Sequence, residues 1–314
     1  MTNMEKNKMT RRNALTAAAA LPLATGLTGA GARPAAAQPA QGPQVPRTYR
    51  VPLGDFEVTA MMAGTRTVPE PKGTFGLNAS DEEFAEVSKA AHIPTDKAQF
   101  FFTPTLVNTG SAVILFDTGL DPAGITAAVE AAGYAPEDVT HVVITHMHGD
   151  HIGGLSDGGT PTFANAALLT GQEEWNHWTE AGNDTFESKV RPLEDQFSFL
   201  GNGEEVAPGI TSVLAPGHTP GHMCFMLESG GQKLMLTADL ANHYVWSVGK
   251  PDWEVRFDMD KELAASSRRK IFGTLAEDKT PFIGYHMPFP AVGYVEAEGD
   301  GFRYMPHSYQ LLMT

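Results

Sequence analysis

The chain has 314 residues, of which 37 are acidic and 22 basic, so its formal net charge is −15 at pH 7. A surface this acidic repels phosphate backbones and anionic lipids, so we expect no nucleic-acid partner and no binding to an anionic membrane. The single cysteine, Cys224, excludes an intramolecular disulfide and lies in an apolar run that predicts a packed core thiol.

Residues 1–37 have the features of a targeting segment. A twin arginine, Arg11-Arg12, precedes a mildly apolar stretch, and Ala35-Ala-Ala37 offers a small-residue cleavage site. The apolar stretch is too rich in Ala, Gly and Thr for a stable membrane helix. We therefore expect twin-arginine export to the periplasm or the medium, with no stable membrane insertion after cleavage. Without this segment the formal charge would be −19, because it holds five basic residues and one acid.

A Pro/Gln-rich linker over residues 38–47 leads into residues 48–314, which predict one large α/β domain. Apolar and alternating runs predict extended segments over 49–62, 100–116, 141–145, 209–215, 222–228 and 232–237. Helical periodicity appears over 80–91, 124–133, 170–181 and 260–276. Ser80 and Glu83 form a capping box, and Asp258 and Asp260 can cap the last helix.

The decapeptide 145–154, Thr-His-Met-His-Gly-Asp-His-Ile-Gly-Gly, carries the strongest functional signal. It places His146, His148, Asp150 and His151 within six residues, directly after a β-branched apolar strand. Two glycines then let the chain turn away without a side-chain clash. Imidazole and carboxylate ligands together suit zinc, with manganese, iron or cobalt as alternatives.

Three later residues can complete a two-metal site. His218 lies between two Pro-Gly pairs, Asp239 ends an apolar strand, and His286 follows another strand-like run. Each alone is compatible with a structural role. Together they predict one ion on His146, His148 and His218, the other on Asp150, His151 and His286, and Asp239 bridging the two.

This order of ligands resembles the metallo-β-lactamase superfamily, over most of the chain after about residue 48. Leu115-Phe-Asp117-Thr-Gly119 is similar to the family's early Asp-Thr-Gly motif. The stretches 49–56, 106–110 and 286–293 look most like the lactonase and methyl parathion hydrolase branch. The resemblance implies a four-layer αββα sandwich, with Asp117 bracing the metal loops from behind the ligands. His222 is expected to support the site rather than to ligate, and relatives in this branch are often homodimers.

The predicted chemistry is hydrolysis of a small molecule. Two divalent ions would supply a hydroxide nucleophile at neutral pH, with Asp239 bridging the ions and Asp150 free to relay a proton. Candidate walls of the substrate pocket are the run Phe100-Phe101-Phe102, with Phe101 foremost, and Trp175, Trp178, Tyr244, Trp246 and Phe289, although core packing is the more common role for each. Tyr244 departs from the acyl-homoserine lactonase pattern, in which a tyrosine follows the bridging aspartate more closely.

We therefore expect a dinuclear metallohydrolase for lactones or aryl esters. A phosphotriesterase that resembles methyl parathion hydrolase is the alternative, because the same site can attack phosphorus. A β-lactamase is disfavoured, since Asp239 stands where some of those enzymes use cysteine. A di-iron redox enzyme and a non-catalytic metal-binding protein are the alternatives from other functional classes.

Overall fold

A computed structural model describes residues 46–312 of the chain. The predicted signal segment and most of the predicted linker lie outside the described residues, so export stays a prediction. Within the described part, no helix is both long and apolar enough to cross a membrane.

The first sheet has seven strands in the order β1-β2-β5-β6-β7-β10-β11. Its first half is antiparallel, whereas β6, β7, β10 and β11 run parallel to one another. The unbroken apolar run at Val142, Val143 and Ile144 suits β7, which is buried on both faces. The strands are β1 (Thr48–Leu53), β2 (Phe56–Met61), β5 (Thr105–Asn108), β6 (Val113–Phe116), β7 (His141–Ile144), β10 (Ala167–Gly171) and β11 (Phe197–Leu200).

The second sheet also has seven strands, in the order β12-β13-β14-β15-β16-β17-β18. All its neighbours pair antiparallel except β15 and β16, which are parallel. Its strands are β12 (Glu205–Ala207), β13 (Ile210–Leu214), β14 (Met223–Ser229), β15 (Gln232–Ala238), β16 (Phe282–Gly284), β17 (Val292–Glu298) and β18 (Gly301–Pro306).

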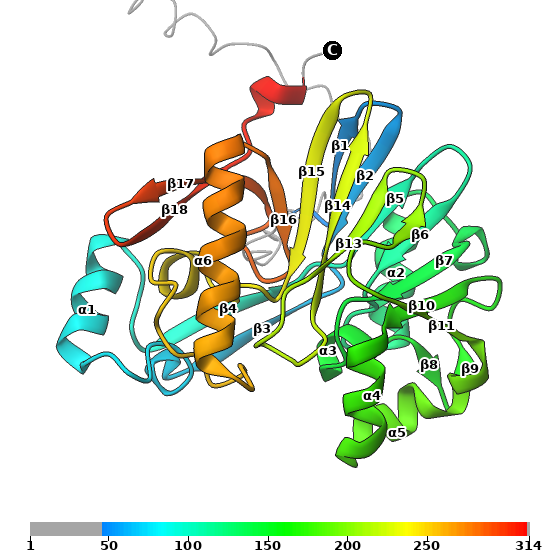
Figure 1. Ribbon diagram of the computed structural model, residues 1–314, viewed down its shortest axis with the longest axis horizontal. Coiled ribbons are helices and arrows are strands. Elements are labelled where there is room, and N and C mark those ends of the chain that lie inside the picture. The colour runs from blue at the N-terminus through cyan, green and yellow to red at the C-terminus, as the bar shows by residue number, and fades with distance from the viewer. Residues whose placement is uncertain (1–45, 313–314) are drawn as a thin grey trace, which may run out of the picture. The chain divides into compact units, whose positions relative to one another are not determined.

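The two sheets pack face to face, and helices cover their outer faces (Figure 1). Phe116 of the first sheet and Phe225 of the second meet in the shared core with ring centroids 5.0 Å apart. On the outer face of the second sheet, Phe272 of α6 packs against Phe282 and Phe302. This arrangement confirms the predicted αββα sandwich.

Helices lie outside the sheets or in the connections between strands. Ser80 caps α1 by accepting from the Glu83 amide, as the capping box predicts, and Asp260 caps α6. The α-helices are α1 (Asp81–Ala90), α2 (Pro122–Ala131), α3 (Gly149–Ile152), α4 (Gln172–Ala181), α5 (Asp184–Lys189) and α6 (Lys261–Asp278). Short 3₁₀ turns are η1 (Pro71–Gly73), η2 (Pro136–Asp138), η3 (Arg191–Gln196) and η5 (Tyr309–Leu312), and η4 (Tyr244–Val248) is a π-helical turn.

A separate hairpin of β3 (Gly64–Pro69) and β4 (Lys97–Phe102) packs with α1 and η4 around a third, aromatic core. Along β4 the even-numbered residues Ala98, Phe100 and Phe102 are buried, and their odd-numbered neighbours are more exposed. A short two-stranded ribbon of β8 (Ser156–Asp157) and β9 (Thr160–Pro161) follows α3.

Candidate metal centre

The ends of neighbouring strands deliver the predicted ligands to one edge of the sandwich. Asp117 follows β6 and His146 follows β7, which run parallel, so both leave the first sheet at the same edge. In the second sheet Asp239 follows β15 and His286 lies just after the parallel strand β16. His218 lies in the loop between β13 and β14. The Met223 amide of β14 donates to the Thr145 carbonyl and so ties the two edges together at 3.1 Å.

The first group of possible ligands consists of His146, His148 and His218, whose ligand atoms lie within 4.8 Å of one another. His148 Nδ1 lies 3.1 Å from His146 Nε2 and 2.9 Å from His218 Nε2. Three ring nitrogens therefore converge on one point, as three imidazole ligands of one cation would.

The second group consists of Asp150, His151, Asp239 and His286. Asp150 Oδ2 lies 3.3 Å from His286 Nε2 and 3.5 Å from His151 Nε2. The side chain of Asp150 is 23% exposed and that of Asp239 only 4% exposed, so Asp150 is the carboxylate that solvent reaches.

Asp239 lies between the two groups. Its Oδ2 atom is 3.3 Å from His218 Nε2 in the first group and 3.2 Å from His286 Nε2 in the second. Its Oδ1 atom is 3.2 Å from His151 Nε2. The structure thus brings all seven predicted ligands together, and it places Asp239 where a bridging carboxylate would sit.

Hydrogen bonds behind the ligands set the protonation of the imidazole rings. His151 Nδ1 donates to Asp117 Oδ2 at 2.8 Å, and His218 Nδ1 donates to Asp258 Oδ1 at 2.9 Å. His286 Nδ1 donates to a backbone carbonyl, that of Phe101, at 2.9 Å. With Nδ1 committed to an outer acceptor, Nε2 is the atom that each ring directs inward and would offer to a metal ion, as metal-ligating histidines do.

Asp117 contacts the loop that carries four of the predicted ligands. Its carboxylate accepts from the Thr145 amide and hydroxyl, both at 2.9 Å, in addition to His151. Its backbone has φ 63°, in the left-handed region that costs a non-glycine residue free energy. The three hydrogen bonds accepted by the side chain hold this conformation in place.

His222 supports the site without joining either group of ligands. Its Nε2 atom accepts from the Asp239 amide at 3.1 Å, and its Nδ1 atom donates to the Ala215 carbonyl at 3.2 Å. Burial lowers the pKa of His222 to about 3, so the ring stays neutral and can accept through Nε2. It therefore orients the backbone of the central carboxylate.

Electrostatics act on individual histidines rather than group by group. Burial would lower the pKa of His218 in the first group, but Asp239 and Asp258 outweigh it and raise the pKa to about 9. Burial lowers the pKa of His148 to about 3, with a further lowering by His218. Burial acts in the same direction on His286, but Asp239 and Asp150 outweigh it and raise the pKa of His286 to about 10. Burial alone would raise the pKa of Asp239, yet His286 and His151 hold it well below its usual range. The carboxylates therefore favour positive charge at the centre.

The residues fit a pair of divalent cations. His151 Nε2 and Asp239 Oδ1 are fully buried and have no hydrogen-bond partner within residues 46–312. Buried polar atoms without a partner are costly, and a cation between them would satisfy both. A donor set of imidazole and carboxylate suits zinc and similar divalent ions.

A cavity of about 490 Å³ opens over this centre, and we call it the metal cavity. Apolar walls and two arginines surround the ligands; besides His148, Asp150, His218, Asp239 and His286, the lining residues are Arg66, Val68, Phe100, Phe102, Leu120, Gly149, Arg256 and Phe257. Of the predicted wall residues, Phe100 and Phe102 are among them, and the other six, Phe101, Trp175, Trp178, Tyr244, Trp246 and Phe289, are not.

Three of those six residues belong to the core or to the surface. Trp178 is buried and donates from Nε1 to Glu174 at 2.5 Å, so it packs behind His148 rather than facing a substrate. Trp175 packs against the rings of Phe186, Phe197 and Phe199. Phe289, partly exposed, lines neither of the two cavities at this edge.

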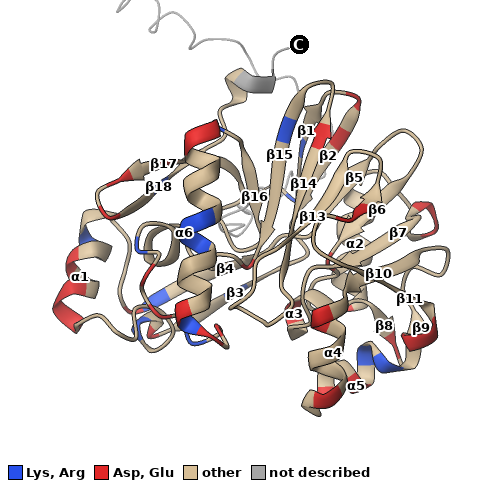
Figure 2. Ribbon diagram, viewed as in Figure 1, with Lys and Arg blue, Asp and Glu red and all other residues tan. Residues whose placement is uncertain are grey.

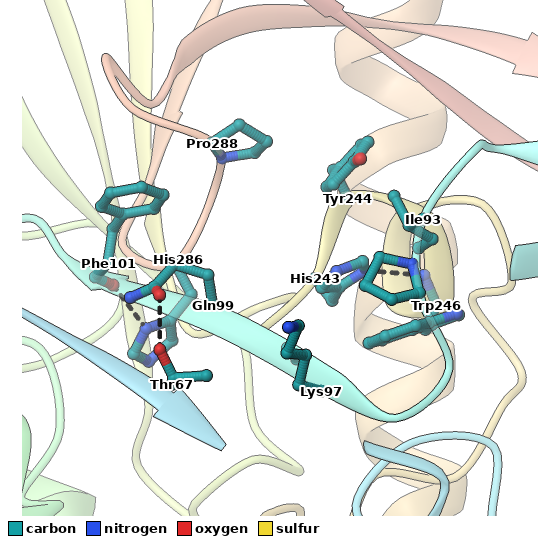
Figure 3. A pocket seen from close by; sticks show the side chains of 12 residues that line it. Thr67, Ile93, Lys97, Gln99, Phe101, His243, Tyr244, Trp246, His286 and Pro288 are labelled. Carbon is teal, nitrogen blue, oxygen red and sulfur yellow. Dashed lines mark hydrogen bonds between the residues drawn. The ribbon is translucent and has the colours of Figure 1, made fainter. Parts of the chain in front are cut away.

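The other three, Phe101, Tyr244 and Trp246, line a second cavity of about 530 Å³ (Figure 3). Strand alternation explains the difference, because Phe101 points away from the face that carries Phe100 and Phe102. The predicted run of phenylalanines therefore lies on the right strand, and Phe100 and Phe102, but not Phe101, line the metal cavity.

Several supporting residues carried no recognisable signal in the sequence. Glu174 of α4 is buried and holds the loops of His146 and His218 together. The Tyr285 hydroxyl donates to the Asp150 carbonyl at 2.5 Å, and Asn242 donates to Asp239 Oδ2 at 2.8 Å. The sequence predicts Asp258 as a helix cap, but in the structure its carboxylate accepts a hydrogen bond from His218 and Asp260 caps α6. Glu174, Tyr285 and Asp258 act over long separations in sequence, whereas Asn242 lies three residues from Asp239 but belongs to no motif that marks it.

Comparison with known proteins agrees with this geometry. A profile of the Metallo-beta-lactamase superfamily matches residues 103–278. The lactamase-like protein nscB of Neosartorya fischeri is 32% identical over 148 residues, or 47% of this chain and 39% of that protein. An N-acyl homoserine lactonase of Bacillus cereus is 26% identical over 157 residues, or 49% of this chain and 58% of that protein. The chain thus spans about two-fifths to three-fifths of these curated relatives.

Solved structures extend the likeness to most of the chain. AidC, a dizinc quorum-quenching lactonase in complex with a product, superposes with a TM-score of 0.78 at 25% identity, covering 83% of this chain and 98% of AidC. The hydrolase AbOPH of the beta lactamase superfamily superposes with a TM-score of 0.79 at 24% identity. The superposition covers 85% of this chain and 99% of AbOPH, so the two proteins share a fold.

Proposed function

Because the chain belongs to the metallo-beta-lactamase superfamily, we propose that it is a dinuclear metal-dependent hydrolase that opens lactones or aryl esters. The observation that supports this most strongly is the position of Asp239, whose two oxygens contact histidines of both ligand groups. The first ion would be held by His146, His148 and His218. The second would be held by Asp150, His151 and His286, and Asp239 would be shared.

When bound, two divalent ions supply Lewis acidity and an activated water at neutral pH. The protein's own part is to hold the ligands, move a proton and shape the cavity. Asp239 is almost fully buried and hydrogen-bonded to Asn242, so it provides fixed negative charge. Asp150 reaches solvent, and its carboxylate can take the proton of the attacking water and deliver it to the leaving oxygen.

The walls of the metal cavity favour an apolar or aromatic substrate. Phe100 and Phe102 approach the His286 ring edge-on, with centroids 5.3 and 5.5 Å away. Phe257 packs against Phe100 at 6.4 Å. Such a lining suits an acyl chain or an aryl group better than a peptide or a nucleotide. The likeness to N-acyl homoserine lactonases supports a lactone as the scissile group.

A hydrolysis panel on metal-quantified enzyme tests the proposal. It pairs dihydrocoumarin, an acyl-homoserine lactone, methyl parathion and nitrocefin, with His148→Ala as the variant that loses a ligand. We expect lactone turnover in the parent enzyme and its loss in the variant. A larger kcat/KM for methyl parathion would instead assign a phosphotriesterase, and nitrocefin turnover alone would assign a β-lactamase. No turnover with two ions bound would overturn the proposal.

Export by the twin-arginine route is part of the same proposal. The Arg11-Arg12 pair and the small-residue site at Ala35-Ala-Ala37 support it. Replacing both arginines with lysine should keep the protein in the cytoplasm, as cell fractionation would show. Unchanged export of that variant would contradict this route.

A further inference from the structure

The second cavity lies on the opposite face of β4 from the metal cavity. Gln99 and Phe101 of β4 line the second cavity, and Phe100 and Phe102 line the metal cavity. His286 borders both. Figure 3 shows the second cavity with Phe101, His286 and Pro288 on one side, and with His243, Tyr244 and Trp246 on the other. Its volume of about 530 Å³ is within the range of small-molecule sites.

The lining of the second cavity combines apolar surfaces with hydrogen-bond donors. Ile93, Phe101 and Pro288 supply partly exposed apolar surface. No aspartate or glutamate lines it, although the chain as a whole has 37 acids and 22 bases. Lys97 also lines it and has no acidic partner among the described residues, so one positive charge is available to a ligand.

His243 adds a second donor. Its Nδ1 atom accepts from the amides of Val245 and Trp246, at 3.1 and 3.2 Å, at the start of the π-helical turn η4. The neutral ring must then carry its proton on Nε2, which has no acceptor within residues 46–312. The Tyr244 hydroxyl likewise has no protein partner in that range and lines the same cavity. Lys97, His243 and Tyr244 therefore offer donors to an incoming acceptor.

We propose that this second cavity is a ligand site for small amphipathic carboxylates, with the apolar body against Phe101 and Ile93 and the carboxylate near Lys97 and His243. Charge complementarity supports an anion, because the lining holds a cation and donors but no acid. The apolar surface of Phe101 and Ile93 supports an aryl or short alkyl body. The site is independent of which bond the metal centre hydrolyses.

Binding of a ligand at this site should change the position of His286 at the metal centre. The side chain of Phe101 lines the second cavity, while its carbonyl accepts from His286 Nδ1 at 2.9 Å. His286 Nε2 in turn belongs to the second ligand group, 3.2 Å from Asp239 Oδ2. A ligand that moves Phe101 also shifts the Phe101 carbonyl oxygen, which is the hydrogen-bond acceptor that orients His286. One hydrogen bond thus connects the two cavities.

Calorimetry on the metal-loaded enzyme tests this site with 3-phenylpropionate and the neutral 3-phenylpropionamide as probes. We expect the carboxylate to bind, and either the amide or the Lys97→Met variant to weaken binding by about tenfold through loss of the charge-assisted contact. Ile93→Trp should fill the cavity and abolish binding. Lys89→Met, at an exposed lysine of α1 outside the cavity, is the matched control and should bind as the parent does.

A second readout separates this site from direct binding at the metals. In cobalt-loaded enzyme the probe should shift the visible absorption bands, and Ile93→Trp should remove the shift. An equal shift in Ile93→Trp would mean that the carboxylate binds the metals, which would overturn the proposal. Absence of binding by the parent enzyme up to about 10 mM probe would overturn it as well. Neither readout requires turnover, so a failure here is distinct from a failure of the proposed hydrolase activity.

Discussion

A buried carboxylate, that of Glu174, joins the two loops that carry the first ligand group. Its Oε1 atom accepts from the Met147 amide at 2.9 Å, between His146 and His148 in the chain. Its Oε2 atom accepts from the Thr219 hydroxyl and the Gly221 amide, at 2.6 and 3.0 Å, in the loop of His218. One side chain therefore sets the spacing of loops about 70 residues apart.

Glu174→Gln should loosen both loops, because an amide nitrogen would face donors that the carboxylate now satisfies. Each buried donor left without an acceptor costs roughly 1–3 kcal/mol, so we expect a drop of that order in the free energy of unfolding. Metal affinity of the first group should fall as well. Chemical denaturation and metal titration measure the two effects. Glu173→Gln, at the exposed neighbour, is the control; equal losses in both variants would refute this role of Glu174.

Asp258 couples His218 to the interior of the protein. Its other oxygen accepts from Arg268 Nη1 at 2.8 Å, and the side chains of both Asp258 and Arg268 have no exposed surface. Burial alone would raise the pKa of Asp258, but His218 and Arg268 hold it below its usual range. The aspartate is thus ionised and anchors the imidazole.

Asp258→Asn should weaken metal binding at the His146, His148 and His218 group by roughly 10–100-fold, the usual effect of losing such a support. It also leaves the Arg268 charge unpaired, so stability should fall by roughly 3–5 kcal/mol. Equilibrium dialysis for each metal and thermal unfolding would measure the two losses. Asp260→Asn keeps a good helix cap at an exposed position and should change neither quantity much. Equal metal affinity of the two variants would contradict the anchoring role.

At the scale of elements, the metal loop depends on close backbone contact after α3. Gly153 has φ −59°, an ordinary helical value, so glycine is not required there for its conformation. A Cβ atom on Gly153 would instead collide with the Leu120 carbonyl oxygen, and one on Gly154 with the Thr118 carbonyl oxygen. The paired glycines let α3 lie against the loop that follows β6.

Gly154→Ala should therefore lower the stability by at least about 1–3 kcal/mol and disturb Asp150 and His151, which lie just before it. Gly273→Ala in α6 is the matched control, since a Cβ there meets nothing within 4 Å. That change should raise the stability by about 0.5–1 kcal/mol through helix propensity. Urea unfolding of both variants checks the opposite signs. A neutral Gly154→Ala would show that the loop can move aside.

Strand β4 illustrates what sequence can and cannot say about an element. The run Phe100-Phe-Phe102 predicted a strand near the site, and a strand is present. Which phenylalanines line the metal cavity depends on the register in which β4 pairs with β3. In that register Phe100 lies opposite Arg66. A shift of one residue would exchange the two faces. Pairing with a strand some 30 residues earlier in the chain sets that register.

At the scale of the whole molecule, the metal centre joins the two sheets. Both sheets supply predicted ligands. Within the described residues, contacts between these ligands, such as that of Asp239 with His151, cross the interface between the sheets. Ions that bind only the folded chain stabilise it by mass action.

Acidic residues are concentrated on some of the outer helices. Figure 2 shows them on α1, α4 and α5.

Removal of the metals with a chelator should lower the melting temperature by roughly 5–10 °C, as expected for ligands at about a hundred times their dissociation constants. Differential scanning calorimetry before and after chelation, followed by reloading with zinc, measures the change and its reversal. His148→Ala should show a smaller shift because it has lost one ligand. An unchanged melting temperature in the parent protein would mean that the groups described here do not bind ions tightly.

The sequence by itself determined the fold class and the family, and it predicted the set of side chains that the structure brings together at the candidate metal centre. It could do so because His146 to His151 are adjacent in the chain, and because Asp239 and His286 follow recognisable strands. Only the tertiary structure decided which aromatic residues face the metals and which line the second cavity. It also decided the roles of Glu174 and Asp258. Those properties depend on strand register and on contacts between distant segments, and neither leaves a local pattern in the chain.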